Sequence, residues 1–441
     1  MTMRKPLRII IVAVGALVLA VVALALVVPR LLDPNAYKDQ ISDLVRSRTG
    51  HELTISGDIR LAVFPWVALE VDHVQLSSAP GFGAAPLVQV GHASVRIKLL
   101  PLLSKQVRMG TISLDDVVVH LARDAQGRSN WQDLGSTAAT PTSPDTATGD
   151  GAGSVLALLE IGGIELRNAR LDWDDKRTGH YYQFSDINVL TGRYSPGKSF
   201  DIDIVCAVAS GRDALARPMR LTSTVNADPA TQRYQLRKAK LEVGLPGGGT
   251  ATLTTDLDVD LAQQHLVMPA IAFQAYALKL TGNLQGVHVL DDPDLRGALH
   301  LAEFNPRELL LALGEPVPKA VDVAVMTMAS ADFNLHAGRD QVTLQPLALQ
   351  LDDSTLTGEF TVSDFAKPRL GFALEVDDIN VDRYLPPPPE QSADAAIPAA
   401  PWPVEALRAL NLDGTLHIGH LQAYRLHSAG LRVIVNTALK D

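Results

Sequence analysis

The pattern of hydrophobic and polar positions divides this chain into an apolar run, a short amphipathic segment and a long region of alternating residues. Residues 9–28 are apolar and uninterrupted by charge. As a helix with a rise of about 1.5 Å per residue, this run would be roughly 30 Å long, the thickness of a bilayer's hydrocarbon core. The pattern therefore predicts a transmembrane helix at 9–28.

The run is longer than the apolar core of a cleaved secretory signal, which has about 7–15 residues. A retained anchor is therefore favoured over a removed signal. Arg4, Lys5 and Arg8 precede the run, and this short cationic tail favours a cytoplasmic N-terminus. We expect the rest of the chain outside the cytoplasm, because large domains translocate largely regardless of their charge.

Residues 29–50 predict an amphipathic helix beside the membrane. Asp33 can cap it, Pro34 suits its first position and Gly50 suits the residue after its end. The apolar residues between these positions recur at helical spacing. Two interpretations remain open: a helix that caps a sheet, and a helix that lies on the outer face of the membrane.

Beyond this helix the period changes from 3.6 to 2, which indicates strands with one apolar and one polar face. Val67, Leu69 and Val71, for example, alternate with Ala68 and Glu70. Turn signals separate these strands, so we expect successive antiparallel hairpins. The pattern predicts a mainly β fold, in which a long curved antiparallel sheet forms an apolar groove with a few capping helices.

Two segments differ in composition from the strands, and one helix interrupts them. Residues 135–153 and the Pro/Ala-rich residues 386–401 predict linkers. A helix is expected near 305–313. The expected organisation is a cytoplasmic tail at 1–8, a transmembrane helix at 9–28, an amphipathic helix at 29–50, a first β-groove segment at 51–134, a linker at 135–153, a second β-groove segment at 154–385, a linker at 386–401 and the start of a further β segment at 402–441.

A five-residue pattern (apolar, any, Gly, any, apolar) recurs along the strands. Because alternate residues of a strand point to the same face, its glycine lies on the apolar face between two apolar side chains. Such a glycine permits a bend and predicts a curved sheet. The competing interpretation is coincidence, because the chain has 32 glycines. The pattern occurs at Ile55–Ile59, Leu190–Tyr194, Leu280–Leu284, Leu295–Leu299, Leu356–Phe360 and Leu412–Leu416.

Composition argues against several functional classes. The net charge is −10 without a sustained basic stretch, so nucleic acid is not an expected partner. Cys206 is the only cysteine, which rules out an intrachain disulfide and a thiolate metal cluster. The sequence carries no nucleophile elbow, phosphate-binding loop or zinc-protease helix. We therefore expect no enzyme, no catalytic residue, no metal and no cofactor.

Several motifs, taken in their order, resemble the bacterial AsmA family. The motifs are Phe64-Pro65-Trp66, Leu99–Leu103, Gly110–Leu114, Val119–Asp124, Gly127–Trp131, Ile164–Trp173, Phe304–Leu310 and Asp378–Pro387. Members of this family usually continue well beyond the region 412–435. The resemblance therefore implies either a chain cut short at residue 441 or a short member.

The resemblance implies a single-pass protein of the bacterial inner membrane, with a cytoplasmic N-terminus and a periplasmic body. Family members are similar to bridge-like lipid-transfer proteins. Phospholipids, the inner membrane and outer-membrane or periplasmic assembly proteins are therefore the implied partners. The implied function is a contribution to phospholipid transport between the two membranes and to outer-membrane biogenesis. The alternative is a non-enzymatic periplasmic assembly or scaffolding factor for outer-membrane proteins, with a closed, dry core.

The apolar strand face is the candidate site, because apolar walls accept acyl chains of many lengths and lack polar groups to select one. The competing interpretation of each residue is ordinary sheet core. The residues expected to line the groove are Leu69, Val71, Val95, Ile97, Leu99, Val117, Val119 and Leu121.

Overall fold

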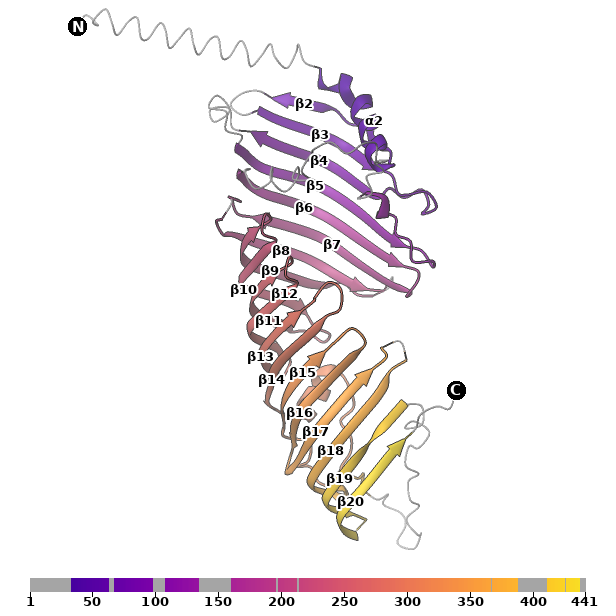
Figure 1. The fold of residues 1–441 in the computed structure, drawn as a ribbon, viewed down its shortest axis with the longest axis vertical. Helices are drawn as coiled ribbons and strands as arrows, with labels where there is room; N and C mark the ends of the chain where they lie inside the picture. Colours follow the sequence, from indigo (N-terminus) through magenta and orange to yellow (C-terminus); the bar gives the residue numbers. More distant parts are fainter. Residues whose placement is uncertain are drawn as a thin grey trace, which may run out of the picture. The chain divides into compact units, whose positions relative to one another are not determined.

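The computed structural model describes residues 33–62, 67–97, 108–134, 160–195, 197–211, 214–365, 367–387, 411–424 and 426–436. These residues form a mainly β fold with few helices (Figure 1). The chain divides into two compact units, Met1–Ala230 (unit 1) and Thr231–Asp441 (unit 2). Within the described part of the chain, every helix is too short or too polar to cross a membrane.

Some of the sequence-based expectations concern segments outside the described residues. These are the tail at 1–8, the transmembrane helix at 9–28, the linker at 135–153 and nearly all of the linker at 386–401. The described structure therefore bears on the two β-groove segments and on the helices beside them.

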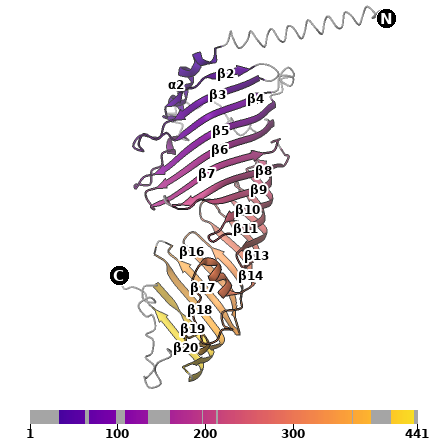
Figure 2. The same cartoon turned by 180° about the vertical axis from the view of Figure 1, so that it is seen from behind.

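The predicted amphipathic helix is present as two consecutive elements at the start of unit 1. The 3-10 helix η1 spans Pro34–Tyr37 and the α-helix α2 spans Lys38–Thr49. The Asp33 side chain caps η1, and Gly50 ends α2 in the left-handed conformation, with φ of 73°. Glycine adopts this conformation without a steric penalty, so the helix ends where the sequence predicts. Figures 1 and 2 show α2 at the β2 end of the strands.

The strands of unit 1 form one mixed sheet. Their bounds are β1 Leu53–Ile55, β2 Ile59–Ala62, β3 Val67–Leu76, β4 Val88–Ile97, β5 Arg108–Arg123, β6 Glu160–Asp175, β7 His180–Thr191, β8 Phe200–Ser210 and β9 Arg217–Asp228. β1 and β2 both pair with β3 and form one broken edge strand. From β3 to β9 each strand pairs with the next, antiparallel except for the parallel pair β5–β6. A second short 3-10 helix, η2, spans Gln132–Leu134.

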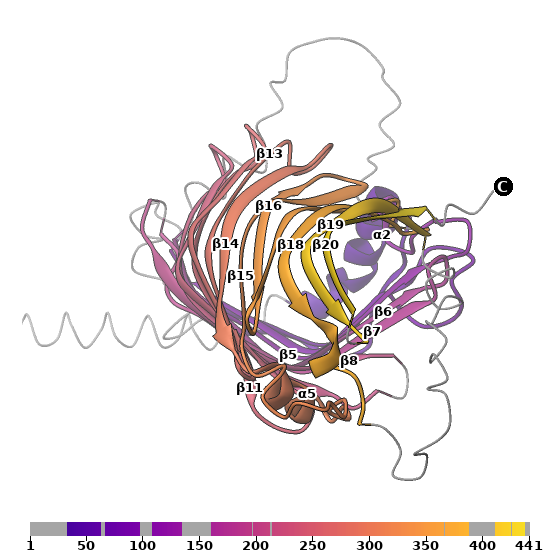
Figure 3. The same cartoon turned by 90° about the horizontal axis from the view of Figure 1, so that it is seen from below.

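Unit 2 repeats this arrangement with eleven strands. Their bounds are β10 Arg233–Gly244, β11 Thr250–Asp260, β12 His265–Ala275, β13 Leu278–Val287, β14 Asp294–Phe304, β15 Ala329–Ala337, β16 Gln341–Leu351, β17 Ser354–Ser363, β18 Arg369–Asn380, β19 Asn411–Ala423 and β20 Leu426–Asn436. Neighbours in sequence pair antiparallel, except for the parallel pair β18–β19. The helix α5 spans Pro306–Leu313 between Asn305 and Gly314, as the sequence predicts, and η3 spans Val381–Arg383. Figure 3 shows β13 to β20 bowed in the same direction.

The prediction of a purely antiparallel sheet is therefore wrong at β5–β6 and β18–β19. The connections between these strands run from residue 124 to 159 and from 381 to 410. A parallel pair needs a crossover connection of about a dozen residues or more, whereas a hairpin needs only two. The two segments that the composition identified as linkers lie within these crossovers.

Four strands of unit 1 bend at residues in the left-handed conformation. These residues are His73 in β3, Asp116 in β5, Asn168 in β6 and Asp186 in β7, with φ near 50°. Asn, Asp and His adopt this conformation more readily than other non-glycine residues. The Asn168 side chain donates a hydrogen bond to the Asp116 carboxylate, so the bends of β5 and β6 are joined.

Five glycines of the recurring pattern stand where neighbouring strands come too close for a side chain. A Cβ atom at each would overlap the carbonyl oxygen of a residue in the adjacent strand. The pairs are Gly57 with Asp72, Gly282 with Ala298, Gly297 with Asn283, Gly358 with Ala373 and Gly414 with Phe372. The backbone geometry requires glycine at these positions, so coincidence does not explain them.

In unit 2 a buried carboxylate ties the segment after α5 to the strands. Asp352, in the turn between β16 and β17, is 5% exposed. It accepts hydrogen bonds from the backbone N–H of Met326 (2.6 Å) and Thr327 (2.9 Å) and from the Tyr384 hydroxyl (2.8 Å). Burial alone would raise the pKa of Asp352, but these hydrogen bonds favour the charged form and hold its pKa below the usual range. Burial and Asp352 together raise the pKa of Tyr384 to about 12.

We expect Gly358→Ala to lower the free energy of unfolding by about 2–3 kcal/mol, because φ at Gly358 is 140° and the new Cβ would overlap the Ala373 carbonyl. Gly371→Ala is the matched control. A Cβ there would meet its nearest atom at 3.7 Å, and we expect a change below about 0.5 kcal/mol. Urea denaturation of the full chain, followed by far-UV circular dichroism, measures both. Equal effects of the two variants would contradict the proposed crowding.

We also expect Asp352 to contribute to acid sensitivity. Its pKa is lower in the folded than in the unfolded state, where it is about 3.9. The stabilisation is therefore fully present above that pH and is lost as the pH falls through the folded pKa. Asp352→Asn should lower the urea midpoint at pH 7 and reduce its further fall below pH 4, whereas Asn at the exposed Asp340 should do neither. An unchanged midpoint at pH 7 would show that the carboxylate is dispensable.

Candidate functional site

The register of unit 1 places apolar residues directly opposite one another from strand to strand. One such row crosses eight strands, and a second crosses seven. The first row is Ile59, Val71, Ala93, Leu114, Leu166, Val189, Ile204 and Leu221. The second is Leu53, Leu76, Val88, Val119, Leu171, Phe184 and Val208. Since paired residues share a face, each row is a continuous apolar stripe across the strands.

The register of unit 2 produces a longer row that crosses all eleven of its strands. It consists of Leu241, Leu253, Phe273, Leu280, Leu301, Ala331, Leu349, Leu356, Val376, Ile418 and Leu431. A neighbouring row contains two of the crowded glycines and is otherwise apolar. It consists of Ile271, Gly282, Leu299, Phe333, Leu347, Gly358, Leu374, Leu416 and Val433. The glycines therefore lie on the apolar face, as the alternation predicts.

The opposite face of unit 2 is exposed and largely polar. The sequence neighbours of the long row form a row of their own: Thr254, Ala272, Thr281, His300, Asp332, Ala348, Thr357, Glu375, His417 and Arg432. Every one of them is exposed, whereas every member of the apolar row is buried or half-buried. The two faces therefore differ sharply in their contact with water.

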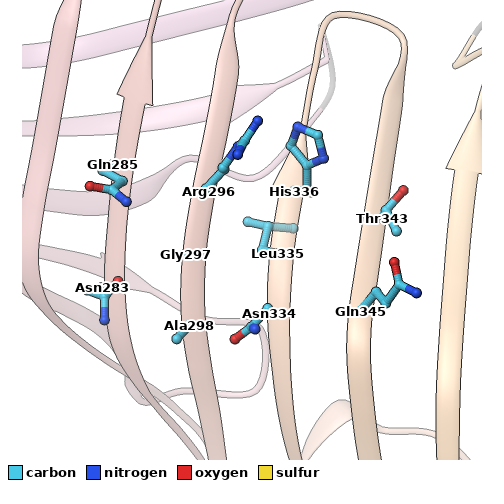
Figure 4. Close-up of a pocket in the computed structure, with 10 residues that line it drawn as sticks. All are labelled: Asn283, Gln285, Arg296, Gly297, Ala298, Asn334, Leu335, His336, Thr343 and Gln345. Atoms are coloured by element: carbon cyan, nitrogen blue, oxygen red, sulfur yellow. The ribbon is translucent and has the colours of Figure 1, made fainter.

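A shallow hollow of about 500 Å³ lies on this polar face (Figure 4). Figure 4 shows Gln285, Arg296 and His336 side by side on neighbouring strands. Arg296 and His336 both contact the carboxylate of Asp294, at 2.9 and 3.0 Å, so each side chain already has an acidic partner. Within the described residues, no three His, Cys, Asp or Glu side chains are grouped to hold a metal ion. The described residues that line this hollow therefore include no group of metal-binding side chains.

Within the described residues of each unit, taken by itself, no second sheet packs over the apolar face. The largest side chains that are fully enclosed among the described residues are only Leu87, His51, Val325 and Asn130. On the apolar face of unit 1, Leu69 remains 44% exposed. A closed core would enclose many large apolar side chains. The described part of each unit is instead a single layer with one apolar face.

A cavity of about 400 Å³ lies between α2 and the apolar face of β1 to β4. Its lining is almost entirely apolar and consists of Pro34, Tyr37, Ile41, Ile55, Ile59, Leu69, Val71, Val74, Val90 and Ala93. The helix thus faces the sheet, which supports its interpretation as a capping helix. Val71 and Val74 are three residues apart but line the same cavity, because the bend at His73 changes the phase of the alternation.

Comparison with known proteins relates this chain to a family by its sequence. The family model described as "AsmA family" matches residues 3–396. This chain belongs to the AsmA family. It is also 24% identical over 323 residues to Protein AsmA of Escherichia coli (strain K12), a match that covers 70% of this chain and 48% of the relative. The chain thus spans about half the length of that relative. No solved structure matches.

The structure of this AsmA-family protein describes seven of the eight residues that were expected to line the groove. The strand pairing brings these seven residues to one face. Leu69 and Val71 line the cavity, and Val95 lies opposite Leu69. The remaining partners are Ile97 with Met109, Val117 with Val90, Val119 with Val88 and Leu121 with Trp173. Leu99 lies outside the described residues. Contact of these residues with lipid stays a prediction.

The sequence analysis named no groove residue in unit 2, although the longest apolar row lies there. The alternation of each strand was visible, but pairing decides which residues form a row. The bends of the strands are visible in the sequence as a change in the spacing of apolar residues. Apolar positions in β3 run Leu69, Val71, Val74 and Leu76, so one spacing of three interrupts the spacing of two. Cys206 is buried in β8, and burial raises the pKa of its thiol.

Proposed function

We propose that this AsmA-family protein holds the acyl chains of phospholipids on the apolar face of its sheets. In this way it contributes to phospholipid transport between the inner and outer membranes and to outer-membrane biogenesis. The proposal includes a single-pass anchor in the inner membrane, a cytoplasmic N-terminus and a periplasmic body. It also includes the absence of catalytic activity. The anchor is supported by the apolar run at 9–28, and the transport role by the family and the exposed apolar rows.

The observation that carries the proposal is the long row of unit 2, an apolar surface across eleven consecutive strands over which the described residues of that unit place no second layer. Removing such a surface from water is favourable by about 25 cal/mol per Å². Hydrocarbon chains could supply that cover while sliding along the row, because its side chains have no polar atoms that would fix one position.

The cavity beneath α2 supports the same function at the first strands of unit 1. Its apolar lining provides no partner for a phosphate or ammonium group, so it suits hydrocarbon and not a headgroup. A headgroup of a lipid seated here would have to stay in water. We therefore propose acyl chains as the bound part and infer no preference for a particular headgroup.

Site-specific photocrosslinking in cells labelled with ³²P-phosphate tests the proposal. We expect benzoyl-phenylalanine at Phe273 or Leu349, in the apolar row, to give phospholipid adducts. The same residue at Ala272 or Ala348 is the matched control, since these sequence neighbours lie on the opposite, exposed face. The adduct at the row positions should be at least fivefold stronger (about 1 kcal/mol of preference).

Two outcomes of this experiment would contradict the proposal. Equal adducts at both faces would indicate non-specific contact with membrane. Absence of adducts at all four positions in a folded, protease-resistant protein would favour the alternative, a scaffolding factor for outer-membrane proteins whose apolar face is covered by protein.

A further inference from the structure

The helix α2 is fixed to the first strands of unit 1 at both of its ends. Before the helix, the carboxamide oxygen of Asn35 accepts a hydrogen bond from the Ile59 N–H (2.9 Å), and its nitrogen donates to the Ile59 carbonyl (3.2 Å). After the helix, His51 is 2% exposed, and its Nδ1 atom lies 2.6 Å from the carbonyl oxygen of Ser77. These contacts hold α2 beside the apolar face of β1 to β4 as a wall whose position is set at both ends.

One side of this helix is apolar and remains open. Tyr37, Ile41 and Leu44 follow one another at helical spacing, so they share one side of the helix. They are 52%, 38% and 58% exposed, and no residue of α2 is buried. Tyr37 and Ile41 line the cavity, and Leu69 on the strand side of the same cavity is 44% exposed. Two apolar surfaces therefore border a space that the described side chains leave unfilled.

The size of the cavity fits one acyl chain and not two. An apolar cavity of about 150 Å³ stays dry and takes one benzene molecule, with its six carbon atoms. At the same ratio, the volume of about 400 Å³ beside α2 holds roughly 16 carbon atoms. This is the size of a single acyl chain, so the second chain of a phospholipid has to lie outside the cavity.

A cation continues the open side of α2 beyond its apolar residues. Arg48 lies one helical turn after Leu44 and thus on the same side, in the last turn of the helix. Its side chain is exposed and forms no ion pair with another residue that the structure describes. With a rise of about 1.5 Å per residue, Arg48 lies roughly 10 Å along the helix from Ile41. A guanidinium group offers parallel N–H donors that match the oxygens of a phosphate, so this end of the wall suits an anionic group.

The cavity also lies close to the proposed source of lipid. Only residues 29–33 separate the apolar run at 9–28 from η1, whose first residue, Pro34, lines the cavity. A segment of this length spans at most about 18 Å. With the run inserted in the inner membrane as proposed above, the Pro34 end of the cavity lies within that distance of the bilayer core.

We infer that the cavity beside α2 binds one acyl chain of a phospholipid and that Arg48 binds the phosphate of the same molecule, an inference that rests on the proposed function. It adds a defined seat and orientation for a lipid in unit 1. The phosphate stays in water, where the exposed Arg48 lies, and the second acyl chain rests on the open apolar face of the strands. A phosphate is common to all phospholipids, so this contact selects no particular headgroup.

The test is photocrosslinking of the full chain in cells, with benzoyl-phenylalanine at Leu44, between the cavity and Arg48. Parallel cultures are labelled with ³²P-phosphate and with ¹⁴C-acetate, which marks acyl chains. We expect an adduct that carries both labels. Arg48→Glu should weaken the ³²P adduct by about fivefold or more, because a carboxylate repels the phosphate, and Arg48→Lys should keep most of it.

Arg46→Glu provides the comparison. It makes the same charge change in the last turn of α2, but Arg46 lies on a different side of the helix, because residues two positions apart do not share a side. The ³²P adduct at Leu44 should be unchanged in this variant. An unchanged adduct in Arg48→Glu, or an equal loss in both variants, would overturn the assignment to Arg48.

The two labels and the positions in unit 2 separate the remaining outcomes. An adduct with ¹⁴C but without ³²P would identify a free fatty acid and overturn the phosphate contact. The adducts expected at Phe273 and Leu349 do not involve this cavity, because both residues lie in unit 2. Lipid adducts there without one at Leu44 would reject this inference alone, and absence of adducts at all three positions would reject the proposed function as well.

Discussion

The alignment of apolar side chains across neighbouring strands is the constraint on which each unit depends. A shift of one residue in any strand pair would turn that strand's apolar side chains toward the polar face. The row from Leu241 to Leu431 keeps its alignment through ten successive strand pairs, including the parallel pair β18–β19. At roughly 0.2–1 kcal/mol for each cross-strand contact, the row stabilises unit 2 by several kcal/mol. Register therefore determines both the stability of the unit and the continuity of its apolar surface.

The bends of the strands preserve this alignment while the sheet curves. A bend changes which residues of a strand point to the apolar face. A bend in one strand alone would therefore turn the apolar side chains of that strand away from those of both neighbours. In unit 1 the bends at His73, Asp116 and Asn168 fall at matching register positions, and apolar pairs continue on both sides of them. In unit 2 the crowded glycines serve a related purpose. Gly282 and Gly358 occupy the same apolar row and allow adjacent backbones to approach more closely than any side chain would permit.

Much of this structure could be predicted from local signals. A helix was expected near 305–313, where α5 lies, and Asp33 and Gly50 marked the ends of the first helical segment. Strand direction could not be predicted, because alternation looks the same whether a strand pairs parallel or antiparallel. The rows could not be predicted either. Leu280 and Leu301 are adjacent on the apolar face only through pairing, and one strand alone carries no information about its partner's register.

The single-layer architecture explains why the apolar face, and not a pocket, is the candidate site. A two-layer sandwich hides its apolar faces against each other, so its core requires no other molecule. In each unit the side chains of an apolar row are covered at their sides by the side chains of neighbouring strands. Within the part of the unit that the structure describes, no second sheet lies above them. Among the described residues, α2 covers part of this face at β1 to β4 and leaves a cavity there. The remaining rows keep a surface that water solvates poorly and that hydrocarbon would cover at no loss of hydrogen bonds. The described strands of each unit are therefore held by backbone pairing and lateral packing, and an apolar ligand on the open side would lower the free energy further.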